Sequence, residues 1–455
     1  FKSLKIFSLE QIFLSSISPL LHDIGFEIID ELSYKLKRNN TLVYIARFNF
    51  NLENPNIVKK SQKNIENIIT NSLLDESIIN SKVFSLVYKE NFSMQKIKLI
   101  RALIEYLSQT LSNITYQSIL LTLTSHSHIT KLFIDYFIMK FDPKEKSKEP
   151  QLKNINLEID AEIKLIPQIM DDKILKLTLS FLQCLLRTNY FFNEETIAFK
   201  IDTKRYGENL KGLQPNLENY IYHNDFYGLH LRMSKVSRGG LRWSERHEDY
   251  REEVKSLMIT QDAKNSIIIP DGSKGGFVIN SKKEVTKEYF ERIYSLYINA
   301  NLDLVDNRID NKIIRDERIV AYDEDDPYFV VAADKGTAAM SDVANAISLK
   351  RHYWLGDAFA SGGSNGYDHK GMGITARGAW VSVQRHFREL NINVQTDPVS
   401  VVGIGDMAGD VFGNGLLRSE TLELVGAFNH IHIFVDPNPD AAKSFVERQR
   451  LFDLP

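Results

Sequence analysis

The sequence predicts an α/β core in the C-terminal half of the chain, preceded by a largely helical region and a small α+β module. Two observations predict the core. After Tyr220, short apolar stretches alternate with helical stretches and glycine clusters, which is the pattern of an α/β domain with largely parallel strands. Residues 399–410 then form an apolar stretch that enters a glycine-rich turn. Upstream of Tyr220 the apolar residues follow helical spacing, so the chain joins regions of different classes.

The composition is that of an ordinary globular protein. The chain has 455 residues, of which 43% are hydrophobic and 25% charged, and this length suits roughly two to four domains. The net charge of −3 gives no electrostatic reason to expect nucleic acid or a membrane surface as a partner. No apolar run approaches the ~20 residues of a membrane helix, and no signal peptide is visible. We therefore expect a cytoplasmic protein.

The first 52 residues are expected to form a small α+β module. Leu4–Phe7 reads as a short strand, followed by a helix that ends at Gly25, the residue type that most often closes a helix. Residues 41–50 alternate apolar and polar side chains, as in a strand with one buried face. The module is ACT-like, of the kind used as a regulatory appendage. A module that serves only for packing is the alternative.

Residues 53–215 are expected to form a mainly helical scaffold with a regulatory or packing role. Apolar side chains recur there at three- and four-residue spacing, the period of an amphipathic helix. Cys184 lies in such a stretch and is expected to be buried. Because it is the single cysteine of the chain, it excludes an intrachain disulfide and a CxxC metal site.

We assign residues 216–385 to the domain that carries the chemistry. Open α/β sheets bind ligands at the carboxyl ends of their strands, and two charged residues are expected there. Residues 267–269 read as a strand that enters a glycine-flanked loop with Lys274, and residues 329–333 read as a strand that enters Asp334. A lysine beside glycines and apolar strands is easily desolvated, which favours a general base. A loop lysine in solvent is the alternative.

Two arginines precede this pair. Arg238 and Arg242 are separated by Gly239, Gly240 and a leucine, and guanidinium groups match carboxylates bidentately. An acidic substrate is therefore natural, with surface arginines in a turn as the alternative. Lys264 is expected at the start of the strand that leads to Lys274.

No metal site is assigned. The histidines lack an HxxxH or HExxH pair, the spacing that places two ligands on one helix face. The acidic run Asp323–Asp326 has carboxylates suited to Mg²⁺, but a solvated acidic turn is the simpler interpretation.

Residues 386–455 are expected to begin a Rossmann-type dinucleotide domain. A strand delivers Gly403 and Gly405 to a tight turn, completed by Asp406 and Met407, where the backbone approaches a pyrophosphate. A second apolar strand, residues 431–435, ends in Asp436, which is placed to accept from the ribose hydroxyls. A carboxylate there repels a 2′-phosphate, which favours NAD over NADP. The acid comes later than the usual ~20 residues, so a long intervening helix is expected.

The glycine-rich stretch 362–373 is expected to serve a cleft or hinge, because ordering so many glycines costs entropy. It leads to a helix start that joins the two domains. Thr375, at that start, is placed to hydrogen-bond a nicotinamide carboxamide.

Taken in order, six stretches resemble the glutamate dehydrogenases. The amino-acid sequences of residues 357–378 and 403–415 are similar to those of the large bacterial NAD-dependent subclass in particular. The resemblance is dense from about residue 220 onward and looser before it, where that subclass carries a long regulatory and helical region. The six stretches are Arg238–Trp243, Gln261–Asn265, Gly272–Gly276, Ala332–Thr337, Gly373–Gly378 and the tract that begins at Gly403.

The resemblance implies reversible oxidative deamination of L-glutamate to 2-oxoglutarate and ammonium, with hydride passing to NAD⁺. By motif, Lys274 activates the attacking water and polarises the substrate carbonyl, and Asp334 shuttles protons to and from the amino nitrogen. Lys264 pairs with the α-carboxylate, and Arg238, where many members have lysine, takes the distal carboxylate. Gly240 belongs to the same substrate site. Members of the family are homo-oligomers, which we expect here too.

The chain also departs from the family's sequence motifs at two places. Asp271 stands beside Lys274 where an apolar residue is expected, and a carboxylate there would weaken the lysine as a base. Leu416–Arg418 is less apolar than in the family.

Only two of the about five or six strands of a dinucleotide domain are visible, and residue 1 is Phe. We therefore expect a segment of a longer polypeptide that is inactive, or nearly so, by itself. Two alternatives follow. One is a non-catalytic relic, or a subunit that needs a separately encoded C-terminal piece. The other is an amino-acid dehydrogenase acting on leucine, valine or phenylalanine, which would not need Arg238.

Overall fold

The chain forms two compact units, Phe1–Ser361 and Gly362–Pro455, each of which is described by itself. The computed structural model describes residues 3–38, 41–51, 55–75, 78, 81–111, 113–145, 148–207, 210, 212–265, 270–281, 283–366, 372–407, 409–429 and 431–454. Among these residues no helix is both long and apolar enough to span a membrane.

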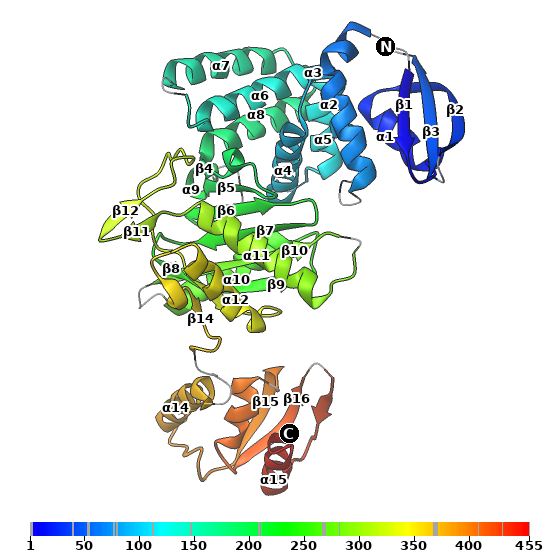
Figure 1. Ribbon diagram of the computed structural model, residues 1–455. Coiled ribbons are helices and arrows are strands. Elements are labelled where there is room, and N and C mark those ends of the chain that lie inside the picture. The colour runs from blue at the N-terminus through cyan, green and yellow to red at the C-terminus, as the bar shows by residue number, and fades with distance from the viewer. Residues whose placement is uncertain are drawn as a thin grey trace. The chain divides into compact units, whose positions relative to one another are not determined.

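The N-terminal module is a three-stranded antiparallel sheet with one helix packed on it (Figure 1). Ile17 on the helix and Phe48 on the central strand are fully buried between the two layers. Gly25 ends the helix at a φ of 105° and donates its N–H to the carbonyl of His22, as expected from the sequence. The strand order is β1-β3-β2, and the elements are β1 (Ser3–Ser8), α1 (Leu14–Ile24), β2 (Glu27–Arg38) and β3 (Thr41–Asn51).

A stack of helices follows (Figure 1). Ser93 and Thr115 cap the starts of two of them, because each side-chain oxygen accepts from the backbone N–H three residues on. Cys184 ends the last helix with 3% of its surface exposed, so the expected buried thiol is confirmed. The elements are α2 (Pro55–Leu74), η1 (Lys82–Phe84), α3 (Ser85–Glu90), α4 (Met94–Thr110), α5 (Tyr116–Ser125), α6 (Ser127–Phe141), α7 (Lys148–Ile163) and α8 (Ile169–Cys184).

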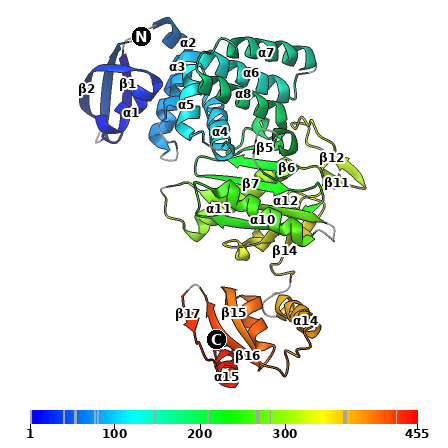
Figure 2. The ribbon, with the colours of Figure 1, turned by 180° about the vertical axis from the view of Figure 1, so that it is seen from behind.

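A nine-stranded sheet forms the core of the rest of the first unit (Figures 1 and 2). Its order is β14-β13-β9-β10-β7-β6-β5-β4, with β8 paired to the start of β10. The strands are β4 (Leu185–Thr188), β5 (Ile197–Asp202), β6 (Leu217–Tyr222), β7 (Phe226–Arg232), β8 (Ser237–Arg238), β9 (Gly240–Ser244), β10 (Asp271–Ile279), β13 (Val331–Ala333) and β14 (Ala360–Ser361). The sheet therefore begins within residues 53–215, the region expected to be mainly helical.

The expectation of a largely parallel sheet is wrong for half of it. The strands from β14 to β10 run parallel, whereas β10, β7, β6, β5 and β4 are antiparallel neighbours. The connections explain the difference, because β6 returns as β7 through three residues, closed by a hydrogen bond between the His223 N–H and the Phe226 carbonyl. So short a link joins only antiparallel strands.

Two helices cover opposite faces of β10. Gly272 faces the backbone of Asp262 on α10, while the Phe277 ring contacts Tyr297 on α11. Since side chains alternate along a strand, an odd spacing between these two positions places the helices on opposite sides. Lys274 shares the face of Gly272. The remaining elements of this unit are η2 (Tyr190–Phe192), α9 (Thr203–Tyr206), α10 (Tyr250–Asn265), α11 (Lys287–Asp303), β11 (Asn307–Ile309), β12 (Lys312–Ile314), η4 (Ala338–Met340), α12 (Ser341–Lys350) and η5 (Gly356–Ala358).

Lys274 lies inside β10 and not in the expected loop. The glycines around it are there for close packing. A Cβ on Gly276 would lie 2.1 Å from the carbonyl oxygen of Arg242, and one on Gly275 would lie 2.5 Å from the ring of His230. The expectation was wrong because glycine was taken as a turn signal, whereas here it lets neighbouring strands approach. The expected strand over 267–269 lies outside the described residues.

A network of largely buried charges joins β4, β5 and β7 to the segment before β13. The expected solvated turn over Asp323–Asp326 is therefore wrong at its two ends, since the side chains of Asp323 and Asp326 are 9% and 0% exposed. Lys200 lies 2.5 Å from the first and 2.6 Å from the second. Only Glu324 and Asp325, between them, are exposed as expected. The network consists of Arg187, Lys200, Arg232, Asp306, Asp323 and Asp326.

The second unit begins at Gly362, whereas the sequence placed the boundary near residue 386. Its small core contains Leu416, Leu422, Leu424 and Ala427. The strand order is β15-β16-β17, with β15 and β16 parallel and β16 and β17 antiparallel. The elements are α14 (Ile374–Glu389), β15 (Val399–Asp406), η6 (Asp410–Asn414), η7 (Gly415–Leu417), β16 (Leu422–Phe428), β17 (Ile433–Val435) and α15 (Ala441–Phe452).

The link between β15 and β16 corrects another expectation. A long helix was expected after the glycine-rich turn, but η6 is a single π-helical stretch and η7 a short 3₁₀ turn. The strand that follows in parallel is β16 and not residues 431–435, so the chain has no long gap to span.

Candidate active site

Lys274 and Asp334 form a close ion pair in the first unit. The Nζ atom of Lys274 lies 2.5 Å from Oδ2 of Asp334, although 60 residues separate them in sequence. Their side chains are 11% and 26% exposed, so the pair is sheltered but still reachable. The sequence analysis expected both residues at the carboxyl ends of their strands. The structure brings them together, although Lys274 lies near the start of β10 and not past its carboxyl end.

Sheet register explains how they meet. β13 lies beside β9, with Ala333 opposite Leu241, and β10 lies on the other side of β9, with Gly275 opposite Leu241. The short β13 therefore ends level with the beginning of β10. Asp334 follows β13 directly, so its carboxylate reaches across Gly240 of β9 to the lysine.

A tight turn fixes Asp334. The side-chain oxygen of Thr337 accepts from the Asp334 N–H at 3.2 Å and donates to the Leu241 carbonyl at 2.7 Å. Gly336 adopts a φ of 82° in this turn, a conformation that side chains rarely tolerate. The Trp243 N–H donates to the carbonyl of Lys335. The turn is thus bound to β9 from both sides.

Gly240 leaves the space that the pair occupies. A Cβ at Gly240 would lie 3.0 Å from Cβ of Asp334 and 3.3 Å from Nζ of Lys274. A side chain there would press on both members of the ion pair. The sequence placed Gly240 in the substrate site, and the structure gives it a second reason to be glycine.

Arg242 is engaged by protein carboxylates. Its Nε donates to Oδ2 of Asp334 at 3.1 Å and its Nη1 to Oε1 of Glu253 at 2.8 Å. Sequence reasoning offered Arg242 with Arg238 as a partner for substrate carboxylates and did not identify Glu253. Glu253 lies in the first turn of α10, and no sequence motif marked it as a partner of Arg242.

The ionisation of Asp334 follows from these contacts. Burial raises its pKa, but the hydrogen bond and charge of Lys274, a backbone N–H and the charge of Arg242 outweigh burial and hold the pKa below its usual value. Burial likewise raises the pKa of Glu253, and its hydrogen bonds from Ser244 and Arg242 bring it below the usual value. Both carboxylates are therefore ionised at neutral pH.

Arg238 extends from β8 into solvent, beside Gly272 of β10. Within the described part of the chain no hydrogen-bond or ion-pair partner is found for its guanidinium, which leaves the group available to a ligand. The side chain of Asp271 does not approach Lys274, because positions three apart on a strand face opposite sides. The concern that this carboxylate weakens the lysine is thus not supported by the geometry.

Lys264 is placed differently from expectation. It lies one residue before the end of α10 and not at the start of a strand. Its side chain is outside the described atoms, so its expected contact with a substrate carboxylate stays a prediction.

The candidate cofactor residues lie in the second unit. Gly403 and Gly405 are within the last four residues of β15 and not in a separate turn. Gly405 has a φ of 153°, and a Cβ there would lie 2.4 Å from the Phe412 ring. Asp406 is the last residue of β15, and Met407 packs against the small core and donates its N–H to the Phe428 carbonyl.

Thr375 is the second residue of α14 and is exposed. The carboxylate of Asp410 accepts from the Ala376 N–H at 3.1 Å, so Asp410 caps this helix from another segment. Burial raises the pKa of Asp410, but hydrogen bonds from Asn414 and from residues 375 and 376 hold it below the usual value.

Asp436 does not occupy the position expected for a ribose-binding acid. It follows β17, which runs antiparallel to β16, and its N–H donates to the carbonyl of Val425. It therefore lies part-way down the sheet, away from the edge where β15 and β16 end. Asn429 follows β16 at that edge, but its Oδ1 accepts from the N–H groups of Ile431 and His432. The argument from Asp436 for NAD over NADP is thus wrong.

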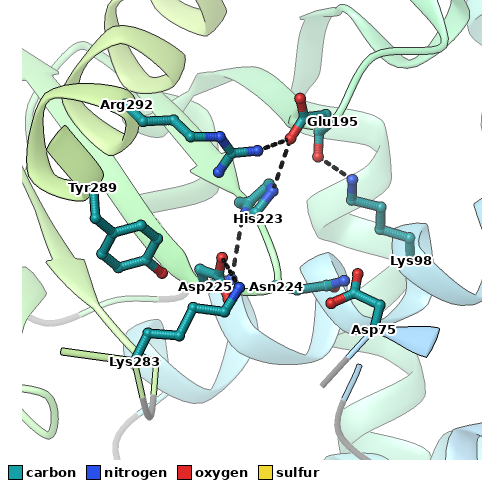
Figure 3. A pocket seen from close by; sticks show the side chains of 9 residues that line it. All are labelled: Asp75, Lys98, Glu195, His223, Asn224, Asp225, Lys283, Tyr289 and Arg292. Atoms are coloured by element: carbon teal, nitrogen blue, oxygen red, sulfur yellow. Dashed lines mark hydrogen bonds and ion pairs between the residues drawn. The ribbon is translucent and has the colours of Figure 1, made fainter. Parts of the chain in front are cut away.

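A separate pocket of about 470 Å³ lies elsewhere in the first unit (Figure 3). Its charged groups face one another: Arg292 pairs with Glu195, and Lys283 lies 3.8 Å from Asp225. Neither Lys274 nor Asp334 lines it, so this pocket is not the site of the ion pair. Its lining residues are Asp75, Lys98, Glu195, His223, Asn224, Asp225, Lys283, Tyr289 and Arg292. In the described residues no group of three or more metal-type ligands is found.

Comparison with known families decides the identity of the chain. The family model described as bacterial NAD-glutamate dehydrogenase, catalytic domain, matches residues 158–455. The chain belongs to this family. Two further models of the same enzyme match upstream, the ACT3 domain over residues 2–63 and helical motif 3 over residues 82–143. The expected resemblance to the large bacterial glutamate dehydrogenases, with an ACT-like module and a helical region before the catalytic domain, is confirmed.

Curated relatives agree. The chain is 42% identical over 456 residues to an NAD-specific glutamate dehydrogenase of Halomonas elongata and 43% identical over 467 residues to that of Pseudomonas aeruginosa. Each alignment covers 97% of this chain and 28% of the relative. The chain therefore spans about 28% of the length of these glutamate dehydrogenases.

A solved structure is also similar to the chain. It is the hetero-hexameric glutamate dehydrogenase from Thermus thermophilus in its Leu-bound form, with 16% identity, a TM-score of 0.33 and 52% of each chain covered. At this score the likeness supports no inference about the present chain.

Proposed function

We propose that the chain supplies the substrate-activating half of a glutamate dehydrogenase reaction. In this reaction L-glutamate, NAD⁺ and water give 2-oxoglutarate, ammonium, NADH and a proton. The observation that carries the proposal is the sheltered pair of Lys274 and Asp334, 2.5 Å apart, within the part of the chain that matches the catalytic-domain family. A lysine and a carboxylate in contact can supply the proton transfers that this reaction needs at water and at the amino nitrogen.

The proposed roles are those that the family resemblance implies, and the contacts are compatible with them. Lys274, in its neutral form, takes a proton from the water that attacks the imino carbon of oxidised glutamate, and its charged form polarises the carbonyl in the reverse direction. Asp334 rests as a carboxylate because its pKa is held low. It therefore accepts a proton before it returns one to the departing amino nitrogen. NAD⁺ supplies the acceptor for the hydride that leaves the α-carbon.

Substrate recognition needs cations for two carboxylates. We assign the distal carboxylate to Arg238, which is exposed and beside the strand of Lys274, and the α-carboxylate to Lys264 at the end of α10. A guanidinium forms two parallel hydrogen bonds to one carboxylate, which favours a dicarboxylic substrate over an apolar one.

For NAD we assign the end of β15, with Gly403, Gly405, Asp406 and Met407, and Thr375 of α14. The fit rests on the parallel β15–β16 pair, because the carboxyl edge of parallel strands is where such sheets bind nucleotides. These residues would hold the pyrophosphate and the carboxamide. We also infer that the chain assembles with copies of itself, which light scattering of the purified protein tests.

The test is NADH oxidation by the purified chain with 2-oxoglutarate and ammonium, alongside calorimetric titration with 2-oxoglutarate. Lys274→Ala is the comparison variant and Lys335→Ala, the exposed neighbour of Asp334, is its matched control. Turnover or binding that Lys274→Ala abolishes and Lys335→Ala retains supports the proposal. Binding without turnover assigns the chain the substrate half only. Equal binding by all three proteins, or by none, overturns the assignment of Lys274.

A further inference from the structure

We propose that Arg242 is a positioning residue that aims Asp334 at Lys274, because it links the carboxylate of Asp334 to that of Glu253. This inference rests on the proposed function for its catalytic consequence. Its structural content, that the Arg242 guanidinium helps to hold Asp334 in place and ionised, stands on the contacts alone.

The side chain of Arg242 bridges two carboxylates from different elements. Nε lies 3.1 Å from Oδ2 of Asp334, after β13, and Nη1 lies 2.8 Å from Oε1 of Glu253, in the first turn of α10. The same Oδ2 receives Lys274. Two cations therefore share one oxygen of Asp334, and one of them is anchored elsewhere.

The anchor is itself fixed. The second oxygen of Glu253 accepts from the hydroxyl of Ser244 at 2.5 Å, and that hydroxyl accepts from the Arg246 N–H at 3.1 Å. Ser244 ends β9, the strand of Arg242. Glu253 thus has both oxygens occupied and little freedom to turn, which leaves its partner guanidinium in one orientation.

The backbone of Arg242 has equally little freedom. The carbonyl oxygen of Arg242 would lie only 2.1 Å from a Cβ atom at position 276, where the chain has glycine. β9 and β10 therefore leave no room for a side chain at position 276, and Arg242 is paired with Gly276 in the sheet. With its backbone in the sheet and its guanidinium bound to Glu253, Arg242 holds Asp334 on the Lys274 side of the sheet.

The chemistry gives this arrangement a purpose. When Lys274 gives up its proton to act as a base, it no longer supplies a positive charge to Asp334. Arg242 does not lose its charge in a protein, so the carboxylate keeps a cation through both protonation states of the lysine. A lysine in place of Arg242 would carry its donors on one nitrogen and would lack the two separate donor atoms, Nε and Nη1, that now face Asp334 and Glu253.

The experiment combines a catalytic and a non-catalytic readout. Arg242→Met, Glu253→Gln and the control Arg246→Met, which removes an exposed arginine two residues beyond β9, are compared in the chain, with Asp334→Asn as the reference. The titration of Asp334 is followed by carboxyl-carbon magnetic resonance after aspartate labelling, its signal being the one that Asp334→Asn removes. Circular dichroism and thermal unfolding verify that each variant folds, and Arg242→Gln replaces Arg242→Met where the latter does not.

We expect the titration midpoint of Asp334 to rise in Arg242→Met, to rise less in Glu253→Gln and to stay unchanged in Arg246→Met. Added guanidinium ion should lower it again in Arg242→Met. Where the chain turns over, kcat falls about tenfold to a hundredfold, the cost of a misplaced catalytic group, with KM for 2-oxoglutarate little changed. In the Asp334→Asn background, removing Arg242 then has little further effect.

An unchanged midpoint in Arg242→Met overturns the inference, whatever the activity. A raised midpoint with additive losses of kcat in the Arg242→Met, Asp334→Asn double variant limits Arg242 to a structural role and overturns the catalytic part. Failure of the proposed function gives a different result from these two outcomes. The chain would then show no turnover or binding that depends on Lys274, while the titration midpoint of Asp334 would still respond to removal of Arg242.

Discussion

Removal of one carboxylate from the buried charge network should destabilise the first unit strongly. Asp326 is fully buried and receives Lys200 at 2.6 Å together with the Nη1 and Nη2 atoms of Arg232. Asp326→Asn keeps the shape but leaves these two cations short of one negative charge. Breaking a buried pair costs roughly 3–5 kcal/mol. We expect a loss near the lower bound, because Lys200 retains Asp323 at 2.5 Å.

The control is the neighbouring Asp325→Asn. The Asp325 side chain is 64% exposed and lies 3.2 Å from Arg315, and exposed pairs contribute at most about 1 kcal/mol. Unfolding in urea is followed by tryptophan fluorescence. One of the three tryptophans, Trp354, reports on the network, because its indole N–H donates to the carbonyl of Pro327 beside it. A loss below about 1 kcal/mol in Asp326→Asn, or an equal loss in both variants, would refute the reasoning.

The pH dependence of the same variant checks the charge. Burial raises the pKa of Asp326, but Arg232 and Lys200 outweigh burial and hold it well below its usual value. A carboxyl group with a depressed pKa in the folded state contributes stability above its unfolded pKa of about 4, and this contribution is lost as pH falls toward the folded value. The difference between wild type and Asp326→Asn should therefore shrink below about pH 4. A difference that stays constant there would show that packing and not charge is responsible.

Three further substitutions test the site and the sheet. Gly240→Ala should lower kcat about tenfold, because its Cβ would lie 3.0 Å from Cβ of Asp334. If the chain is inactive, the same variant should weaken 2-oxoglutarate binding about tenfold in calorimetry. The control is Gly378→Ala, because position 378 has open space around it. Arg238→Met should weaken 2-oxoglutarate but not pyruvate binding, and equal effects would favour an apolar amino acid as substrate. Gly275→Ala should cost about 1–3 kcal/mol of unfolding free energy through overpacking against His230, and unchanged urea unfolding would contradict that packing.

Local patterns in the sequence were sufficient where structure depends on neighbouring residues. The period of the apolar residues predicted the helices that end at Cys184, and the glycine at position 25 predicted the end of α1. Asp334 was found because an apolar stretch runs directly into it, and that stretch contains β13. In each case the signal and the structural feature lie within one element.

Distant partners explain what the sequence could not show. Glycine signals a turn or a close approach equally well, and at Gly275 only the position of His230, on another strand, decides between them. Asp323 and Asp326 looked solvated because their cations are far away in sequence, Arg187 lying 136 residues before Asp323. Burial of such groups depends on the partner and not on the local composition.

The direction of the strand before Asp436 was also predicted wrongly, since β17 runs antiparallel to β16. Here the sequence contained a turn signal. Only Asn429 to His432 separate β16 from β17, and asparagine readily accepts from backbone N–H groups two residues on, which starts a tight turn. The Oδ1 atom of Asn429 makes this contact with Ile431. A short link that opens with asparagine between two apolar stretches indicates a hairpin, so Asp436 could have been placed on an antiparallel strand.

The dependence of the site on sheet register follows from β9. Gly240 leaves room for the ion pair, Leu241 accepts from Thr337, and Arg242 holds Asp334. Because side chains alternate along a strand, a slip of one residue between β13 and β9 would carry Asp334 to the opposite face, away from Lys274. The pairing of Ala333 with Leu241 is therefore as necessary to the proposed chemistry as the reacting groups. This explains why the site is built from three adjacent strands, whose relative positions are set by backbone hydrogen bonds.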